Sequence, residues 1–364
     1  MDKASPLSCI VVARTYPTLQ RWAAGRQAYG QDRSASHSPA RKPWRPARVI
    51  AAGLLCTLSA QLPAADELAV VATIKPLHSL VSAVMASVGK PQLIIRGTTS
   101  PHSFSMRPSD ARKLENADLV FLIGEAVETS ISQSIDALAA DARVVVLASA
   151  DGIVKRPLRE GGSFEWSHEH AHHGADQRTE DGAVLETDAD AGEAFDMHVW
   201  LDPTNARAMT RAIADALAAA DPPNSAVYID NAARLLQRLE ELTTEIASEV
   251  APVRGRGFLV FHDAYQHFED RFGLVAAGSA VVTADRSPGV RRIRELRRKV
   301  RDLEVKCVMA EPQFDPRLVH VIVQGVEAKV GSVDPLGSTI RSGPELYFTL
   351  LRDMATSFRT CLSS

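Results

Sequence analysis

The run Leu68-Ala69-Val70-Val71-Ala72-Thr73-Ile74 sets the pattern on which the fold is built. This short β-rich run ends at Lys75-Pro76, and apolar residues then recur at helical spacing from Leu77 to Val88. Further strand-like runs follow at 93–95, 118–123 and 143–147, with helix-like segments between them. Strands that alternate with helices predict a parallel sheet covered on both faces.

The pattern lapses between residues 161 and 195, where Gly, Asp, Glu, Ala and His dominate and no apolar period survives. We interpret this stretch as a mobile insertion in the first lobe. Order returns at His198, and Asp202-Pro203 supplies an N-cap followed by a proline at the first helical position.

A second helix is expected from Asn224 to Val250, with no Gly or Pro in its interior. At 1.5 Å per residue it would be about 40 Å long, enough to connect two lobes rigidly. The α/β rhythm then returns, with strands at 258–261 and 305–310. Between them lies an arginine-rich segment, residues 288–303, that is expected to form a helix whose basic face is exposed to solvent. Docking of this face to an acidic partner is the alternative.

We therefore predict an α/β protein of two Rossmann-like lobes with parallel sheets. Residues 66–222 form the N-terminal lobe with the insertion at 161–195, residues 223–251 the linking helix and residues 252–364 the C-terminal lobe.

Residues 1–65 are expected to be a leader. They carry nine basic and two acidic residues, so the rest of the chain has a net charge of −10 within a total of −3. Arg41 to Arg48 supply a charged region before the apolar run Val49–Leu58, and small residues follow, as in a secretory signal peptide preceded by an upstream extension. A lipoprotein site at Cys56 is disfavoured because the preceding residue is Leu55. The apolar run Val49–Leu58 is too short for a stable membrane anchor. The net negative charge of residues 66–364 argues against a nucleic-acid partner.

Two cysteines, Cys307 and Cys361, remain once this leader is set aside. An even pair in an exported chain favours a disulfide, and two buried free thiols are the alternative.

Four residues are candidate ligands of one metal ion: His102, His198, His262 and Asp334. All four fall in loops or at strand ends, and parallel α/β sheets bind ligands beyond the carboxyl ends of their strands. Two belong to each lobe, so a cation held by all four would link the lobes. Three imidazoles and one carboxylate suit tetrahedral zinc better than magnesium, calcium or manganese.

The sequence motifs around these residues resemble the metal-ligand motifs of the zinc-specific solute-binding proteins of bacterial ABC importers. The matching segments are Ser100–Asp110, Asp196–Pro203, Phe261–Tyr265, Val333–Gly337 and Ala310–Gln313, together with the cysteine pair. The resemblance covers about residues 68–361 and implies zinc in a cleft between two lobes joined by a long helix, with delivery to a membrane permease. Manganese-type relatives have a carboxylate in place of the third histidine, so His262 favours zinc. Some relatives carry a Glu where this chain has Pro101, and either Asp334 or water completes the shell.

A histidine tract, His168, His170, His172 and His173, lies in the insertion and also fits this family. It is interpreted as an accessory zinc-binding segment, with a solvated spacer as the alternative. Residues 168–172 formally satisfy the H-E-x-x-H signature of zinc proteases. That motif needs a helix packed in an apolar core, whereas glycines flank this one and no amphipathic stripe supports it.

The sequence thus predicts a periplasmic, monomeric Zn²⁺-binding protein that serves an ABC-importer permease and catalyses no reaction. A periplasmic zinc buffer or metallochaperone without a transport role, and a secreted zinc hydrolase, are the alternatives.

Overall fold

The computed structural model describes residues 67–159, 195–281 and 289–363. The predicted leader (1–65) and the histidine tract (His168, His170, His172 and His173) lie outside the described residues. Among the described helices, none combines the length and apolarity that a membrane span requires.

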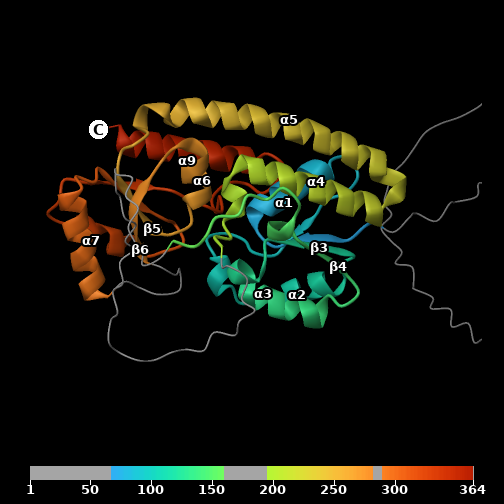
Figure 1. The fold of residues 1–364 in the computed structure, drawn as a ribbon. Helices are drawn as coiled ribbons and strands as arrows, with labels where there is room; N and C mark the ends of the chain where they lie inside the picture. The colour runs from blue at the N-terminus through green and yellow to red at the C-terminus, as the bar shows by residue number, and fades with distance from the viewer. Residues whose placement is uncertain (1–66, 160–194, 282–288, 364) are drawn as a thin grey trace, which may run out of the picture. The chain divides into compact units, whose positions relative to one another are not determined.

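The first sheet contains four parallel strands in the order β2-β1-β3-β4. The strands are β1 (Val70–Ala72), β2 (Gln92–Leu93), β3 (Leu119–Leu122) and β4 (Arg143–Val146). The helices around it are α1 (Lys75–Val84), α2 (Pro108–Glu115), α3 (Glu125–Leu138) and α4 (Pro203–Ala220). In Figure 1, α2 and α3 lie on one side of β3 and β4, and α1 and α4 lie on the other. Every residue of β1 and β3 is buried, as expected for a sheet covered on both faces.

The second sheet repeats this topology with the order β6-β5-β7-β8. Its strands are β5 (Phe258–His262), β6 (Ala276–Val281), β7 (Cys307–Ala310) and β8 (Lys329–Ser332), and its helices are α6 (Gln266–Phe272), α7 (Val290–Asp302), α8 (Pro316–Val323) and α9 (Leu346–Leu362). Alternate residues of β5 face opposite sides. Phe258 and Val260 join the core shared with α9, while Leu259 and Phe261 join a separate cluster with α7 and α8.

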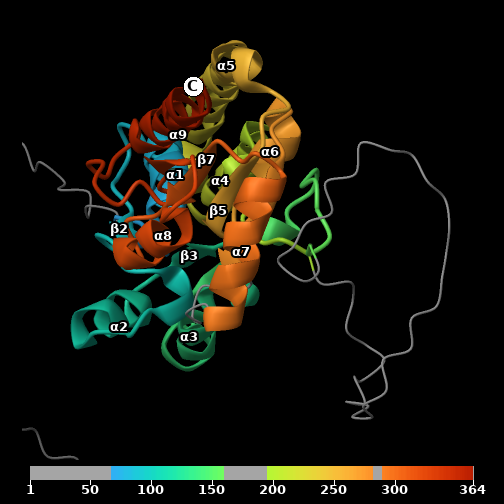
Figure 2. The same cartoon turned by 90° about the vertical axis from the view of Figure 1, so that its left-hand side faces the viewer.

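The long helix predicted after the Asp221-Pro222-Pro223 break is present as α5 (Ser225–Val250), about 39 Å long. It packs against α1 and α4 beside the first sheet and against α9 beside the second, and α5 and α9 run side by side in both views (Figures 1 and 2). In its first two turns Val227 is exposed, whereas Tyr228 and Asn231 are buried. Asn231 donates its amide to the carbonyls of Val84 and Ala86, which ties α5 to the end of α1.

The predicted disulfide is confirmed. Cys307 on β7 is bonded to Cys361 on α9, with their Cα atoms 5.7 Å apart. It fastens the last helix of the chain to the centre of the second sheet. Residues 64–364 form one compact unit by their contacts, so the division into lobes at residues 222 and 251 stays a prediction.

The basic helix expected at 288–303 is α7, which buries Leu296 and Val300 and exposes Arg291, Arg294, Arg298 and Arg301. Its exposed arginines share one face, as expected for a solvated helix surface.

Candidate metal centre

Three histidines from separate segments converge beyond the carboxyl ends of the strands. His102 lies in a 3-10 turn (Pro101–Ser103) after β2, His198 caps a second 3-10 turn (Val199–Leu201), and His262 is the last residue of β5. Each offers a ring nitrogen, and the three nitrogens lie within 4.8 Å of one another. Nitrogens on a tetrahedral zinc ion with bonds of 2.0–2.1 Å are about 3.3 Å apart. The group is therefore slightly wider than a zinc shell.

His198 is held by Asp196, two residues before it. The Asp196 Oδ1 accepts hydrogen bonds from the backbone N–H of His198 at 3.0 Å and from its ring Nδ1 at 2.7 Å. Burial alone would raise the pKa of Asp196, but the neighbouring His198 outweighs it, so that the pKa is lowered and the carboxylate stays charged. With Nδ1–H donated to Asp196, the lone pair of Nε2 is left for a metal.

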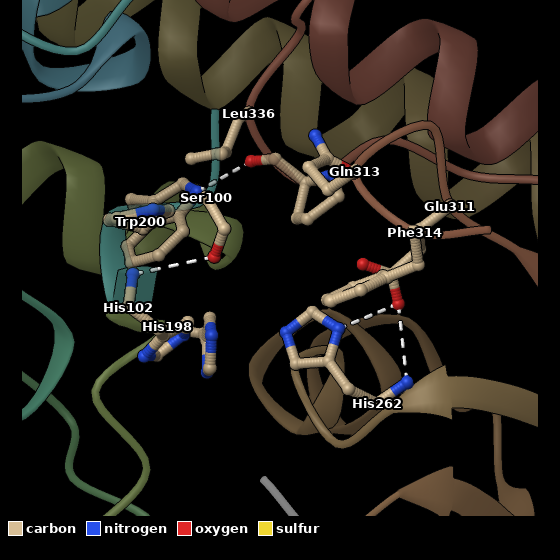
Figure 3. A pocket seen from close by; sticks show the side chains of 11 residues that line it. Ser100, His102, His198, Trp200, His262, Glu311, Gln313, Phe314 and Leu336 are labelled. Carbon is tan, nitrogen blue, oxygen red and sulfur yellow. Dashed lines mark hydrogen bonds and ion pairs between the residues drawn. The ribbon is translucent and has the colours of Figure 1, made fainter. Parts of the chain in front are cut away.

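His262 is held in the same way by Glu311, which directly follows β7. The Glu311 Oε1 accepts from the backbone N–H of His262 at 3.2 Å and from its Nδ1 at 2.7 Å. Burial alone would lower the pKa of His262, but the Glu311 carboxylate outweighs it and raises the pKa. Figure 3 shows Glu311 behind His262, with the other side of the imidazole turned toward His198.

The three histidines line a cavity of only about 10 Å³. Its lining also includes Pro335 and three residues drawn in Figure 3, namely Trp200, Phe314 and Leu336. A cavity of this size holds about one water-sized particle. The site therefore has room for a single ion beside the three imidazoles.

Asp334 does not join the three histidines in this structure, because its carboxylate is occupied within its own loop. It accepts hydrogen bonds from Leu336 N at 3.0 Å, from Ser338 Oγ at 2.7 Å and from Gln313 Nε2 at 2.7 Å. The loop is also held from outside, where the buried ammonium of Lys75 donates to the carbonyls of Gly337, Ser338 and Ile340. Asp334 as the fourth ligand stays a prediction.

Sequence reasoning missed the roles of Asp196 and Glu311, although both stood inside the motifs that it singled out. The signal available for Asp196 was its position two residues before a candidate ligand, where an Asp side chain can accept from the backbone N–H two residues further on. Glu311 lies 49 residues from His262, so only the pairing of β5 with β7 brings the two together.

A profile of the family described as zinc-uptake complex component A, periplasmic, matches residues 70–361. The high-affinity zinc uptake system protein ZnuA of Brucella suis biovar 1 (strain 1330) is 42% identical over 312 residues, which cover 82% of this chain and 93% of that protein. Among solved structures, a crystal structure of ZnuA superposes with a TM-score of 0.66 at 23% identity, covering 81% of this chain and 99% of that one. A deletion mutant of ZnuA with zinc bound gives 0.63 at 22% identity, with the same two coverages. The two structural likenesses establish the shared fold.

Proposed function

Because the chain belongs to the ZnuA family of periplasmic zinc-uptake components, we propose that it captures Zn²⁺ and delivers it to the permease of an ABC importer. The observation that carries this proposal is the convergence of His102, His198 and His262, with ring nitrogens within 4.8 Å of one another, in a cavity of ion size. Neutral imidazoles are good zinc ligands and poor ligands for magnesium or calcium.

The two carboxylates behind the histidines explain how the chain would retain zinc. Asp196 and Glu311 fix the tautomer and orientation of His198 and His262 before the ion arrives, so little ordering remains to be done on binding. Their negative charges also offset part of the ion's charge inside a buried site. Either Asp334 or a water molecule would complete a four-coordinate shell.

We also propose how the protein is exported and in which state it acts. Residues 1–65 would direct export and be removed, and the mature chain would act as a monomer in the periplasm. The chain would catalyse no reaction, because a component that binds the ion and hands it to a permease needs none. The histidine tract would gather zinc near the site.

Calorimetric titration of the chain with Zn²⁺ and with Mn²⁺ tests the binding function. We expect one tight zinc site and much weaker manganese binding, and substitution of any one of the three histidines by alanine should abolish the tight site. Equal affinity for the two metals would contradict a zinc-specific function.

Uptake in cells separates the importer component from a zinc buffer. Deletion of the gene should slow growth in zinc-depleted medium, and a His262→Ala variant should fail to restore it. A periplasmic buffer without a transport role would bind zinc in the titration but leave uptake intact.

A further inference from the structure

A partly buried arginine, Arg159, joins the segment before His198 to the segment after His262. Arg159 ends the described segment that precedes the insertion, and its side chain is 18% exposed. Its Nε donates to both carboxylate oxygens of Asp263 at 3.1 Å, and Nη2 also donates to Asp263. Its Nη1 and Nη2 donate to Glu269 at 2.8 and 3.0 Å. One planar guanidinium thus holds two carboxylates in fixed positions, a geometry that lysine does not reproduce.

On one side this arginine is connected to His262. Asp263 is the next residue in the chain after His262. The paired hydrogen bonds from the Arg159 guanidinium to the two carboxylates, called the fork below, therefore restrain the backbone that carries His262. Glu269 is the second carboxylate that Arg159 binds, and it is itself held in place. Its side chain is 2% exposed and also accepts from the backbone N–H of Ala276 at the start of β6. Burial raises the pKa of Glu269, which the adjacent Arg159 guanidinium partly offsets.

On the other side Arg159 is connected to His198. Pro157 pairs with Phe195 in an isolated antiparallel bridge, and the carbonyl of Arg156 accepts from Asp196 N at 2.7 Å. Asp196 is the residue that orients the His198 ring. The segment is fixed further back by Val154, which exchanges hydrogen bonds with the side chain of Asn205 on α4.

We propose that Arg159 is a positioning residue that holds His262 in register with His198 and thereby sets how long zinc stays bound. This role rests on the proposed function, because it concerns the same site. The imidazole rings of His198 and His262 are 5.3 Å apart between centroids, and they belong to the two segments that Arg159 connects. Separation of these two histidines releases the ion, and breakage of the fork makes that separation easier.

Positioning and simple electrostatics predict opposite results for the loss of this arginine. Removal of a positive charge and exposure of two carboxylates near a cation would, by Coulomb attraction alone, slow the release of zinc. Loss of positioning would speed it. The direction of the change therefore identifies the mechanism.

The test is stopped-flow release of Zn²⁺ from the full chain into excess fluorescent chelator, with the association rate measured separately. In Arg159→Met we expect dissociation to be faster by on the order of 10-fold or more, with a smaller change in association. Arg156→Met is the matched control, because the Arg156–Asp270 pair joins the same two segments but its side chains are 33% and 42% exposed. The control should release zinc at nearly the wild-type rate.

If the substitution only destabilised the fold, a smaller fraction of the chain would bind zinc and the melting temperature would fall. The dissociation rate of the zinc that is bound would not change. Should Arg159→Met not fold, Arg159→Lys carries the test, because it keeps the charge and loses the fork; its zinc should leave severalfold faster. An unchanged or slower release in the folded variant, or an equal acceleration in Arg156→Met, overturns the role of Arg159. If the wild-type chain itself binds no zinc, it is the proposed function that fails.

Discussion

Replacement of Glu311 by glutamine should weaken zinc binding although Glu311 does not touch the metal. Glu311 has a fully buried side chain, and its Oε1 receives both the ring Nδ1–H and the backbone N–H of His262. Glutamine can accept the same hydrogen bonds through its carbonyl oxygen, so the ring orientation is preserved. The negative charge that makes the imidazole more basic is lost. Loss of such partners costs about 10- to 100-fold in metal affinity, or roughly 1.4–2.7 kcal/mol.

The effect should depend on pH with a definite sign. The Glu311 carboxylate raises the pKa of His262, so in the wild-type chain protons compete with zinc from a higher pH than for an ordinary imidazole. In Glu311→Gln that pKa falls and proton competition weakens. The ratio of the two dissociation constants should therefore be larger at pH 8, where protons compete less with zinc, and should shrink toward pH 6.

Competition titrations against a zinc chelator of known affinity, at pH 8 and at pH 6, measure this ratio. Glu245→Gln is the control, since Glu245 is exposed and pairs with Arg352 on the surface. A Glu311→Gln affinity within twofold of wild type at pH 8 would refute the argument. So would a ratio that grows as the pH falls.

Three further outcomes follow from the same geometry. Zinc affinity of the wild-type chain should fall with decreasing pH and begin to fall above pH 6.5, because the pKa of His262 is raised; a dissociation constant that stays flat between pH 8 and pH 6 would disagree. Cys361→Ser opens the loop across 54 residues and should lower the free energy of unfolding by about 4 kcal/mol in the chain-entropy model, measured by urea denaturation, whereas wild-type stability would show the bond to be dispensable. Removal of residues 161–194 should abolish weak secondary zinc binding in calorimetry and leave the tight site intact, and loss of the tight site would show that the insertion forms part of it.

Much of the fold followed from local pattern. The alternation of apolar runs and helical segments predicted two parallel sheets, and Asp202-Pro203 predicted the start of α4, where the Asp202 side chain accepts from Thr204 N. Two strands were missed. The sequence of β6 is Ala-Ala-Gly-Ser-Ala-Val and that of β8 is Lys-Val-Gly-Ser, so each has a single β-branched residue and no aromatic residue, too few to identify a strand. Neighbouring strands, and not local propensity, hold them in the sheet.

The candidate site could also be predicted only in part from the sequence. The three histidines could be grouped because the sequence placed each in a loop or at a strand end, and parallel α/β sheets bind ligands beyond the carboxyl ends of their strands. Asp334 was grouped with them by the same rule, yet its side chain is engaged by Gln313 and Ser338. The direction of a side chain in a loop depends on which local hydrogen bonds it makes, and these are not visible in spacing. For Arg159 and Glu311 the contacts join residues 104 and 49 positions apart, which only the tertiary structure reveals.

X-ray absorption at the zinc edge tests the central claim most directly. The chain lacking residues 161–194, loaded with one equivalent of Zn²⁺, should show about three imidazole nitrogens near 2.0–2.1 Å and one oxygen in a four-coordinate shell. The imidazole signal should fall by one ligand in His262→Ala. A shell dominated by oxygen or sulfur, or one that His262→Ala leaves unchanged, would contradict the assignment of His102, His198 and His262 as the zinc site.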